Sequence, residues 1–326
     1  MSYDADLIVD RRRMRRKLTF WRVSAAVIAV AALVAVAVLV TPAGRSSLAG
    51  ANGIARISIS GIITSNNERV EALERLGRSS AKAVIIHVNS PGGTTAGSEQ
   101  LYDALTQLKA KKPVVIVVDG LCASGAYIAA LAADHITAQS TSLVGSIGVL
   151  VQYPNFADLL KTIGVRVEEV KSSPLKAAPN GFEPTSPEAR AALDDLVKDS
   201  YAWFRGLVKS RRNMDDATLE KVADGRVFTG RQALGLKLVD ELGDERAAIA
   251  WLAAEKKIDA DTPVRNYRLA PRFSDMNFLR LSATVTLQAL GFDALAERIG
   301  QSGAIQAVDR LSLEGLLALW QPATTN

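Results

Sequence analysis

Short apolar runs alternate with amphipathic stretches through the middle of the chain. Ile54–Ile63 alternates apolar and polar residues, while Ala83–Val88 and Pro113–Val118 are almost entirely apolar, as in strands covered on both faces. The remaining pattern predicts shorter strands at 135–139, 143–151 and 165–170, and helices at 68–78, 95–109, 123–133, 186–211 and 216–237. Because strands and helices alternate at this spacing, the chain is expected to be an α/β protein with parallel crossover units.

The N-terminal region contains an uncharged apolar run, residues 23–40. Eighteen residues are about the minimum for a membrane-spanning helix and exceed the usual core of a signal peptide. An uncleaved signal anchor is therefore preferred over a cleaved signal peptide or a buried core helix. The arginine-rich flank predicts a single-pass protein of the inner membrane with a cytoplasmic N-terminus. The residues after about 45 are then expected on the extracytoplasmic side.

Composition narrows the possible functions. A hydrophobic content of 48% with 22% charged residues excludes disorder for most of the chain. Cys122 is the single cysteine, so no internal disulfide can form, and with only His87 and His135 no metal site or other cofactor is expected. Residues 1–22 carry +4 of the net charge of +5, which leaves a nearly neutral body and no expected nucleic-acid partner.

Two turns made of small residues follow predicted strands. In Leu121-Cys-Ala-Ser-Gly-Ala-Tyr, Ser124 stands at the start of a helix, as a nucleophile or as an ordinary N-cap. In Asn89-Ser-Pro-Gly-Gly, Gly92 and Gly93 allow the backbone to approach a substrate closely. If the two strands are neighbours, one of these glycine amides and the amide of Gly125 can form an oxyanion hole.

A serine nucleophile needs a base, and the residues alone leave three candidates. His87 and His135 are the only histidines, and each also has a structural interpretation. Lys176 lies in a stretch without acids between Glu169 and Glu183, and a desolvated lysine can act as a neutral base.

The chain resembles the signal peptide peptidase A family of membrane-anchored Ser–Lys proteases, which have the ClpP/crotonase fold of repeated β-β-α units. The resemblance spans residues 54–249 and rests on four segments: Val88-Asn-Ser-Pro-Gly-Gly, Ala123-Ser-Gly-Ala-Tyr, Gly145-Ser-Ile-Gly-Val, and Gly225-Arg-Val-Phe-Thr-Gly through Asp240. It implies Ser124 as nucleophile, Lys176 as general base, Ser146 as the residue that orients the lysine, and Gly92 or Gly93 at the oxyanion. The residues around Lys176 depart from the family pattern, with Ser173-Pro-Leu before it and Ala177 after it.

The resemblance also implies a function and an assembly. We expect a serine endopeptidase that degrades remnant signal peptides without a cofactor and forms a dome-shaped homo-oligomer. A crotonase-type acyl-CoA enzyme and a catalytically inactive membrane scaffold are the alternatives. The predicted organisation is a basic cytoplasmic segment, a transmembrane anchor, a linker, a peptidase domain and a C-terminal helical extension, at 1–22, 23–40, 41–53, 54–270 and 271–326.

Overall fold

The computed structural model describes residues 17, 21, 53–269 and 317–319. The chain divides into two compact units, residues 1–51 and 52–326. The predicted anchor, residues 23–40, lies outside the described residues. None of the helices within the described ranges has an apolar stretch long enough to cross a bilayer.

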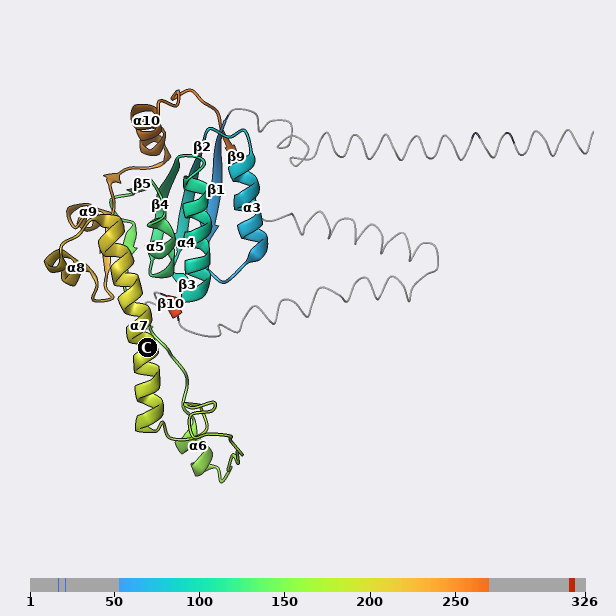
Figure 1. Cartoon of the computed structure of the whole chain (residues 1–326), viewed down its shortest axis with the longest axis vertical. Helices are drawn as coiled ribbons and strands as arrows, with labels where there is room; N and C mark the ends of the chain where they lie inside the picture. The colour runs from blue at the N-terminus through green and yellow to red at the C-terminus, as the bar shows by residue number, and fades with distance from the viewer. Residues whose placement is uncertain (1–16, 18–20, 22–52, 270–316, 320–326) are drawn as a thin grey trace, which may run out of the picture. The chain divides into compact units, whose positions relative to one another are not determined.

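A parallel sheet forms the centre of the second unit (Figure 1). Its strands run in the order β7-β6-β4-β2-β1-β9, with β5 paired to β4 and β8 paired to β5. Within this sheet, only the β6–β7 pair is antiparallel, so the predicted α/β class with a largely parallel sheet is confirmed. The bounds are β1 Ile54–Ser60, β2 Ala83–Ser90, β4 Val114–Ala123, β5 His135–Ala138, β6 Leu143–Gly145, β7 Val227–Thr229, β8 Glu241–Leu242 and β9 Val264–Asn266.

Helices cover both faces of this sheet because its side chains alternate between two cores. Val84, Ile86 and Val88 of β2 belong to the larger core, which α3 (Asn67–Arg78), α4 (Thr95–Lys109) and α5 (Gly125–Ala130) complete. Ala83 and Ile85 point the other way, into a smaller core closed by α10 (Glu245–Lys256). The nearly continuous apolar run of β2 therefore reflects burial on both faces, as predicted.

One strand, β4, joins two parts of the sheet. Its first half, Val115–Val118, pairs with β5, and its last three residues, Leu121–Ala123, pair with β6. Asp119 and Gly120 lie between the two halves and are exposed. Ser124 follows β4 directly, at the boundary between this strand and α5.

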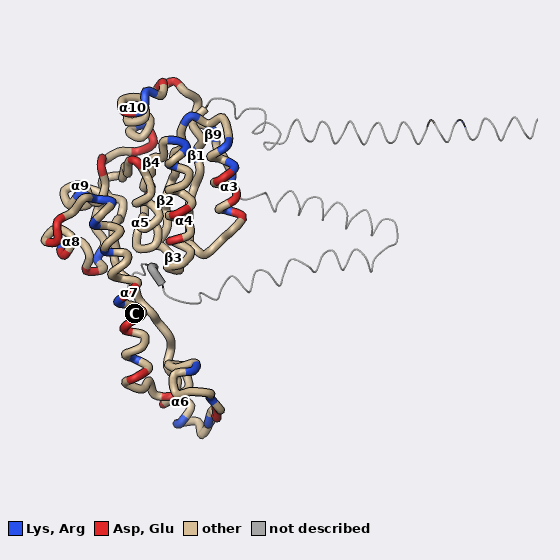
Figure 2. The backbone as a smooth tube through the Cα atoms, in the orientation of Figure 1, with Lys and Arg blue, Asp and Glu red and all other residues tan. Residues whose placement is uncertain are grey.

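Residues 151–186, which we call the distal segment, connect β6 to α7 (Pro187–Arg212) and include α6 (Ala157–Thr162). Phe204 and Val208, in the C-terminal half of α7, are buried in the larger core. A helix of 26 residues is about 39 Å long, and the distal segment lies at its other end (Figure 1). Figure 2 shows basic and acidic residues interspersed along α7 and the distal segment.

Several predicted elements differ from the structure. Residues 165–170 are not a strand, and 143–151 contains only the three residues of β6. The predicted helix 216–237 is divided into α8 (Asp216–Val222), β7 and α9 (Gly230–Gly235). Of the predicted helical extension, residues 317–319 instead form β10, because they pair with β3 (Gly92–Thr94). The rest of that extension lies outside the described residues.

Candidate active site

Ser124 has a backbone conformation that an ordinary N-cap serine does not adopt. Its φ of 54° and ψ of −118° fall outside the extended region typical of that position. Its side chain makes no capping hydrogen bond, and the residue is 1% exposed. A strained serine of this kind costs about 1–3 kcal/mol and is characteristic of functional sites. The N-cap alternative is therefore not supported.

Ser146 lies beside Ser124 because the two residues follow a paired position of adjacent strands. Ala123 of β4 pairs with Gly145 of β6, and the Ser124 amide donates to the Gly145 carbonyl at 2.7 Å. Ser146 also has a positive φ, 51°, and is buried. The Ser146 amide donates to the Arg226 carbonyl at 2.8 Å, which fixes this turn against the chain leading into β7.

The glycine turn is the neighbour of the serine turn, as the sequence predicts. Ser90 of β2 pairs with Cys122 of β4, so the two strands end side by side. Gly93 packs so closely that a Cβ at this position would lie 1.8 Å from the Ile63 carbonyl oxygen. Gly92 has a φ of 98°, which favours glycine.

Ser90 is a site residue that the sequence analysis did not single out. It is fully buried; its hydroxyl donates to the Gly61 carbonyl at 2.6 Å and accepts from the Gly92 amide at 3.1 Å. Ser90 thereby holds the glycine turn in place and engages the Gly92 amide. Its position immediately before Pro91-Gly-Gly was the available signal.

Tyr127 anchors the helix that begins after Ser124. Its ring is fully buried and its hydroxyl donates to the Leu238 carbonyl at 2.8 Å. Gly125 is the first residue of α5, and amides in the first turn of a helix have no acceptor within the helix. The Gly125 amide is thus suited to an oxyanion.

Cys122, two residues before Ser124, is not a competing nucleophile. It is completely buried, and this burial raises the pKa of its thiol well above the ordinary value. A neutral, inaccessible thiol is a poor nucleophile.

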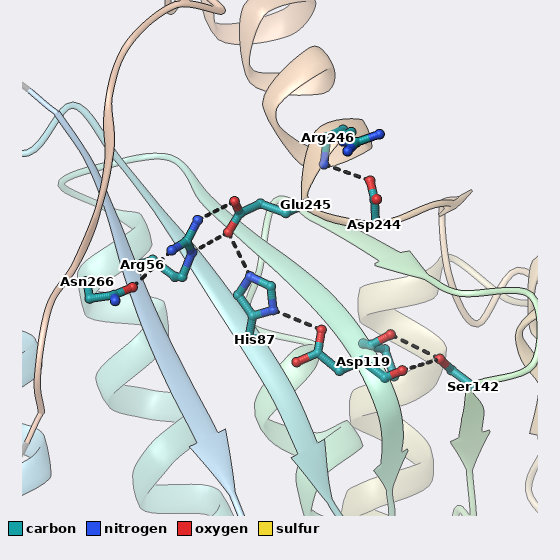
Figure 3. A network of polar contacts seen from close by, with 9 residues as sticks. Arg56, His87, Asp119, Ser142, Asp244, Glu245, Arg246 and Asn266 are labelled. Atoms are coloured by element: carbon teal, nitrogen blue, oxygen red, sulfur yellow. Dashed lines mark hydrogen bonds and ion pairs between the residues drawn. The ribbon is translucent and has the colours of Figure 1, made fainter.

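Both histidines are engaged near α10. His87 bonds Asp119 through Nδ1 and Glu245 through Nε2, at 2.8 Å each (Figure 3). His135 stacks on Trp251 of α10, with ring centroids 4.7 Å apart. Since Ile85, two residues before His87 on β2, belongs to the core closed by α10, His87 lies on the face of the sheet opposite α5. The structure therefore brings neither histidine to Ser124.

The structure also does not bring Lys176 to Ser124 within one chain. Lys176 is exposed in the distal segment, where its amide donates to the Ser173 carbonyl at 3.1 Å. The acids that flank its stretch, Glu169 and Glu183, both bind Lys171, at 2.7 and 2.6 Å. Lys176 has no such ion pair among the described residues, and its role as base stays a prediction.

The described part of the chain contains no cluster of side chains suited to binding a metal ion. No group of three or more histidine, cysteine, aspartate or glutamate side chains there is arranged to hold a metal ion.

The chain matches known proteins over most of this region. Residues 106–259 match the model of Peptidase family S49, and residues 56–143 match that of Clp protease. A Synechocystis sp. protein named as a protease is 37% identical over 210 residues, which cover 64% of this chain and 76% of that protein. The chain belongs to peptidase family S49. This confirms the resemblance to signal peptide peptidase A and the ClpP-like α/β fold.

Two further relatives carry more specific names. An Enterococcus faecium protein named as signal peptide peptidase SppA is 30% identical over 230 residues, covering 66% of this chain and 67% of that protein. Protease 4 of Haemophilus influenzae is 31% identical over 235 residues, which cover 71% of this chain and 38% of Protease 4. The chain thus spans well under half of Protease 4.

Proposed function

We propose that this S49 protein is a membrane-anchored serine endopeptidase with Ser124 as its nucleophile. The observation that carries the proposal is the backbone of Ser124, which is strained, uncapped and placed between the glycine turn and Ser146. A serine with a purely structural role, such as a helix N-cap, normally has an extended backbone instead. Family membership favours peptide hydrolysis over the acyl-CoA chemistry of crotonase-type enzymes.

In the proposed reaction, Ser124 attacks the peptide carbonyl carbon and its proton passes to a base. The amides of Gly93 and Gly125 hold the oxyanion, since the Gly92 amide already donates to Ser90. The base then returns the proton to the leaving amine and later activates the water that releases the acyl group.

We propose that the base is Lys176 of a neighbouring copy. Two features of the distal segment support this: Lys176 is exposed there, and so are many large apolar side chains. An exposed apolar surface of this kind is typical of a protein interface. Its members are Phe156, Leu159, Ile163, Val165, Val167, Val170, Leu175 and Phe182. A head-to-tail contact that repeats around a ring would supply every Ser124 with a lysine.

The proposed substrates are remnant signal peptides and other unfolded apolar peptides at the outer face of the inner membrane. The apolar run 23–40 and its basic flank support anchoring with the catalytic domain outside the cytoplasm. A short linker, residues 41–53, would keep this domain close to the bilayer where such peptides leave it.

The primary test is hydrolysis of a fluorogenic leucine- and alanine-rich peptide by the full chain and by its Ser124→Ala variant. We expect hydrolysis only with Ser124 present and unchanged thermal unfolding. Equal rates for the two proteins would refute the nucleophile. Absence of hydrolysis in both would favour the inactive-scaffold alternative.

A complementation assay tests the shared dyad. Ser124→Ala and Lys176→Ala should each be inactive, but a co-assembled equimolar mixture should recover about a quarter of wild-type activity, because one site in four combines an intact serine with an intact lysine. No recovery in a mixture shown to contain mixed assemblies would place both residues of the dyad in one chain.

A further inference from the structure

Strand β3 has a neighbour on each side. On one side, Ile63 forms an isolated parallel bridge with Gly93; the Ile63 amide donates to the Gly92 carbonyl at 2.8 Å and the Thr94 amide to the Ile63 carbonyl at 2.9 Å. On the other side, β10 (Leu317–Leu319) runs antiparallel, with Ala318 opposite Gly93 (Figure 1). A segment near the C-terminus thus fills the second edge of β3.

This second edge belongs to the candidate active site. β3 contains both Gly92 and Gly93, and β10 also contacts α4 and α5. Helix α5 begins immediately after Ser124. The C-terminal segment therefore lies along the glycine turn, close to the start of the helix that follows Ser124.

An extended peptide substrate would require the same edge. Peptides commonly bind by adding a strand to an exposed edge, where main-chain hydrogen bonds hold them and side chains select the sequence. Among the described residues, β10 is the strand that covers this edge of β3. Its sequence, Leu317-Ala-Leu, has the composition that we propose for substrates.

We propose that residues 317–319 act as an internal competitor that holds the substrate edge of β3 against incoming peptides. This inference rests on the proposed function and adds regulation to the same site. Because the competitor belongs to the same chain, dilution of the protein does not remove it. A substrate must displace β10, so the apparent affinity falls by the fraction of molecules whose edge is open.

Two truncations of the full chain test the competitor by kinetics. Ending the chain after Leu316 removes β10, whereas ending it after Leu319 keeps β10 and removes only residues 320–326. If β10 is seated in nine molecules of ten, the first truncation lowers KM about tenfold with kcat unchanged. The second truncation and the full chain should share one KM at every protein concentration. Equal KM values for all three proteins would overturn the proposal.

A binding assay keeps this inference separate from the proposed function. In the Ser124→Ala background, fluorescence anisotropy of a labelled leucine- and alanine-rich peptide reports occupancy without cleavage. Ala318→Pro, which removes a strand amide, should tighten binding as the truncation does, while Thr324→Pro, outside β10, should not. Peptide binding that is equal in all variants would overturn the competitor even in an active protease. Tighter binding without β10 would support it even if no variant cleaves peptides.

Discussion

Ser124 and Ser146 occupy equivalent positions on two adjacent parallel strands. Each follows one member of the Ala123–Gly145 pair, and each has a positive φ. Adjacent strands lie about 4.8 Å apart, so the two hydroxyl-bearing residues start from neighbouring points of the same sheet edge. A lysine that enters between them can donate a hydrogen bond to the Ser146 hydroxyl oxygen while its amine faces Ser124.

Removing the Ser146 hydroxyl should impair catalysis and leave the fold intact. Ser146→Ala is expected to lower kcat by about ten- to a hundredfold, because an unoriented base samples the productive geometry less often. Ser140→Ala is the matched control, since Ser140 is exposed on the loop before β6. Steady-state kinetics and thermal unfolding check both variants. Equal kcat values for the two would remove Ser146 from the mechanism.

Adding one methyl group to the glycine turn should abolish activity. In Gly93→Ala the new Cβ would lie 1.8 Å from the Ile63 carbonyl oxygen, so the bridge between Ile63 and β3 must open. Gly206→Ala provides the control: nothing lies within 4 Å of its Cβ position, and it stands inside α7. The control should gain up to about 1 kcal/mol of stability. Chemical denaturation and peptide hydrolysis measure both, and an active Gly93→Ala enzyme would contradict this geometry.

The hydrogen bond from the Tyr127 hydroxyl to the Leu238 carbonyl, which anchors α5, should contribute measurably to the free energy of unfolding. Tyr127→Phe keeps the buried ring but leaves the Leu238 carbonyl without its donor. The expected loss is about 1–3 kcal/mol of unfolding free energy, from urea denaturation. Tyr102→Phe serves as the comparison, because Tyr102 is only partly buried. A loss no larger than in the comparison would show that this hydrogen bond contributes little.

The free energy of unfolding should decrease at acidic pH because Glu245 becomes protonated. Its hydrogen bond with Arg56, together with that from His87, holds the pKa of the Glu245 carboxyl below its usual range (Figure 3). A depressed pKa stabilises the fold above the ordinary value of about 4.3, and this contribution disappears as pH falls through the folded-state pKa.

The variant Glu245→Gln isolates this effect. It should be less stable than wild type near neutrality, and the difference should shrink as the pH is lowered from about 5 to 3. Urea denaturation at each pH provides the measurement. A difference that stays constant over this range would exclude Glu245 as the titrating group.

The central strands were predicted well from the sequence, because strands that are buried on both faces consist of consecutive apolar residues. Apart from His87, the runs Ala83–Val88 and Val114–Val118 are apolar on both faces, and they lie in β2 and β4. Residues 165–170 have a similar valine content, yet Val165, Val167 and Val170 are exposed and no strand forms. A strand needs a partner for its backbone, and the local pattern does not say whether one is available.

The site was predictable where its residues follow paired strands. Ser124, Ser146 and the glycine turn meet because β2, β4 and β6 are neighbours. Since parallel strands end at the same edge of a sheet, motifs that follow such strands can be expected to lie together. Lys176 is different, because it is exposed in the distal segment and its spacing from Ser124 in the sequence does not say where it lies in the fold. β10 was also missed, because its pairing with β3 joins residues more than 200 positions apart.

The path of β4 has a consequence for how this molecule loses activity on heating. The strand that immediately precedes Ser124 runs through the middle of the sheet, with β5 and β6 hydrogen-bonded along it. Ser124 should therefore stay ordered until the whole unit melts, and the amides of β4 should exchange with solvent only by global unfolding. Helix α6, by contrast, buries none of its residues, so the segment that carries Lys176 should open at a much lower free energy. If Lys176 is the base, as we propose, moderate heating should lower activity by loosening the distal segment while the turn that contains Ser124 remains folded.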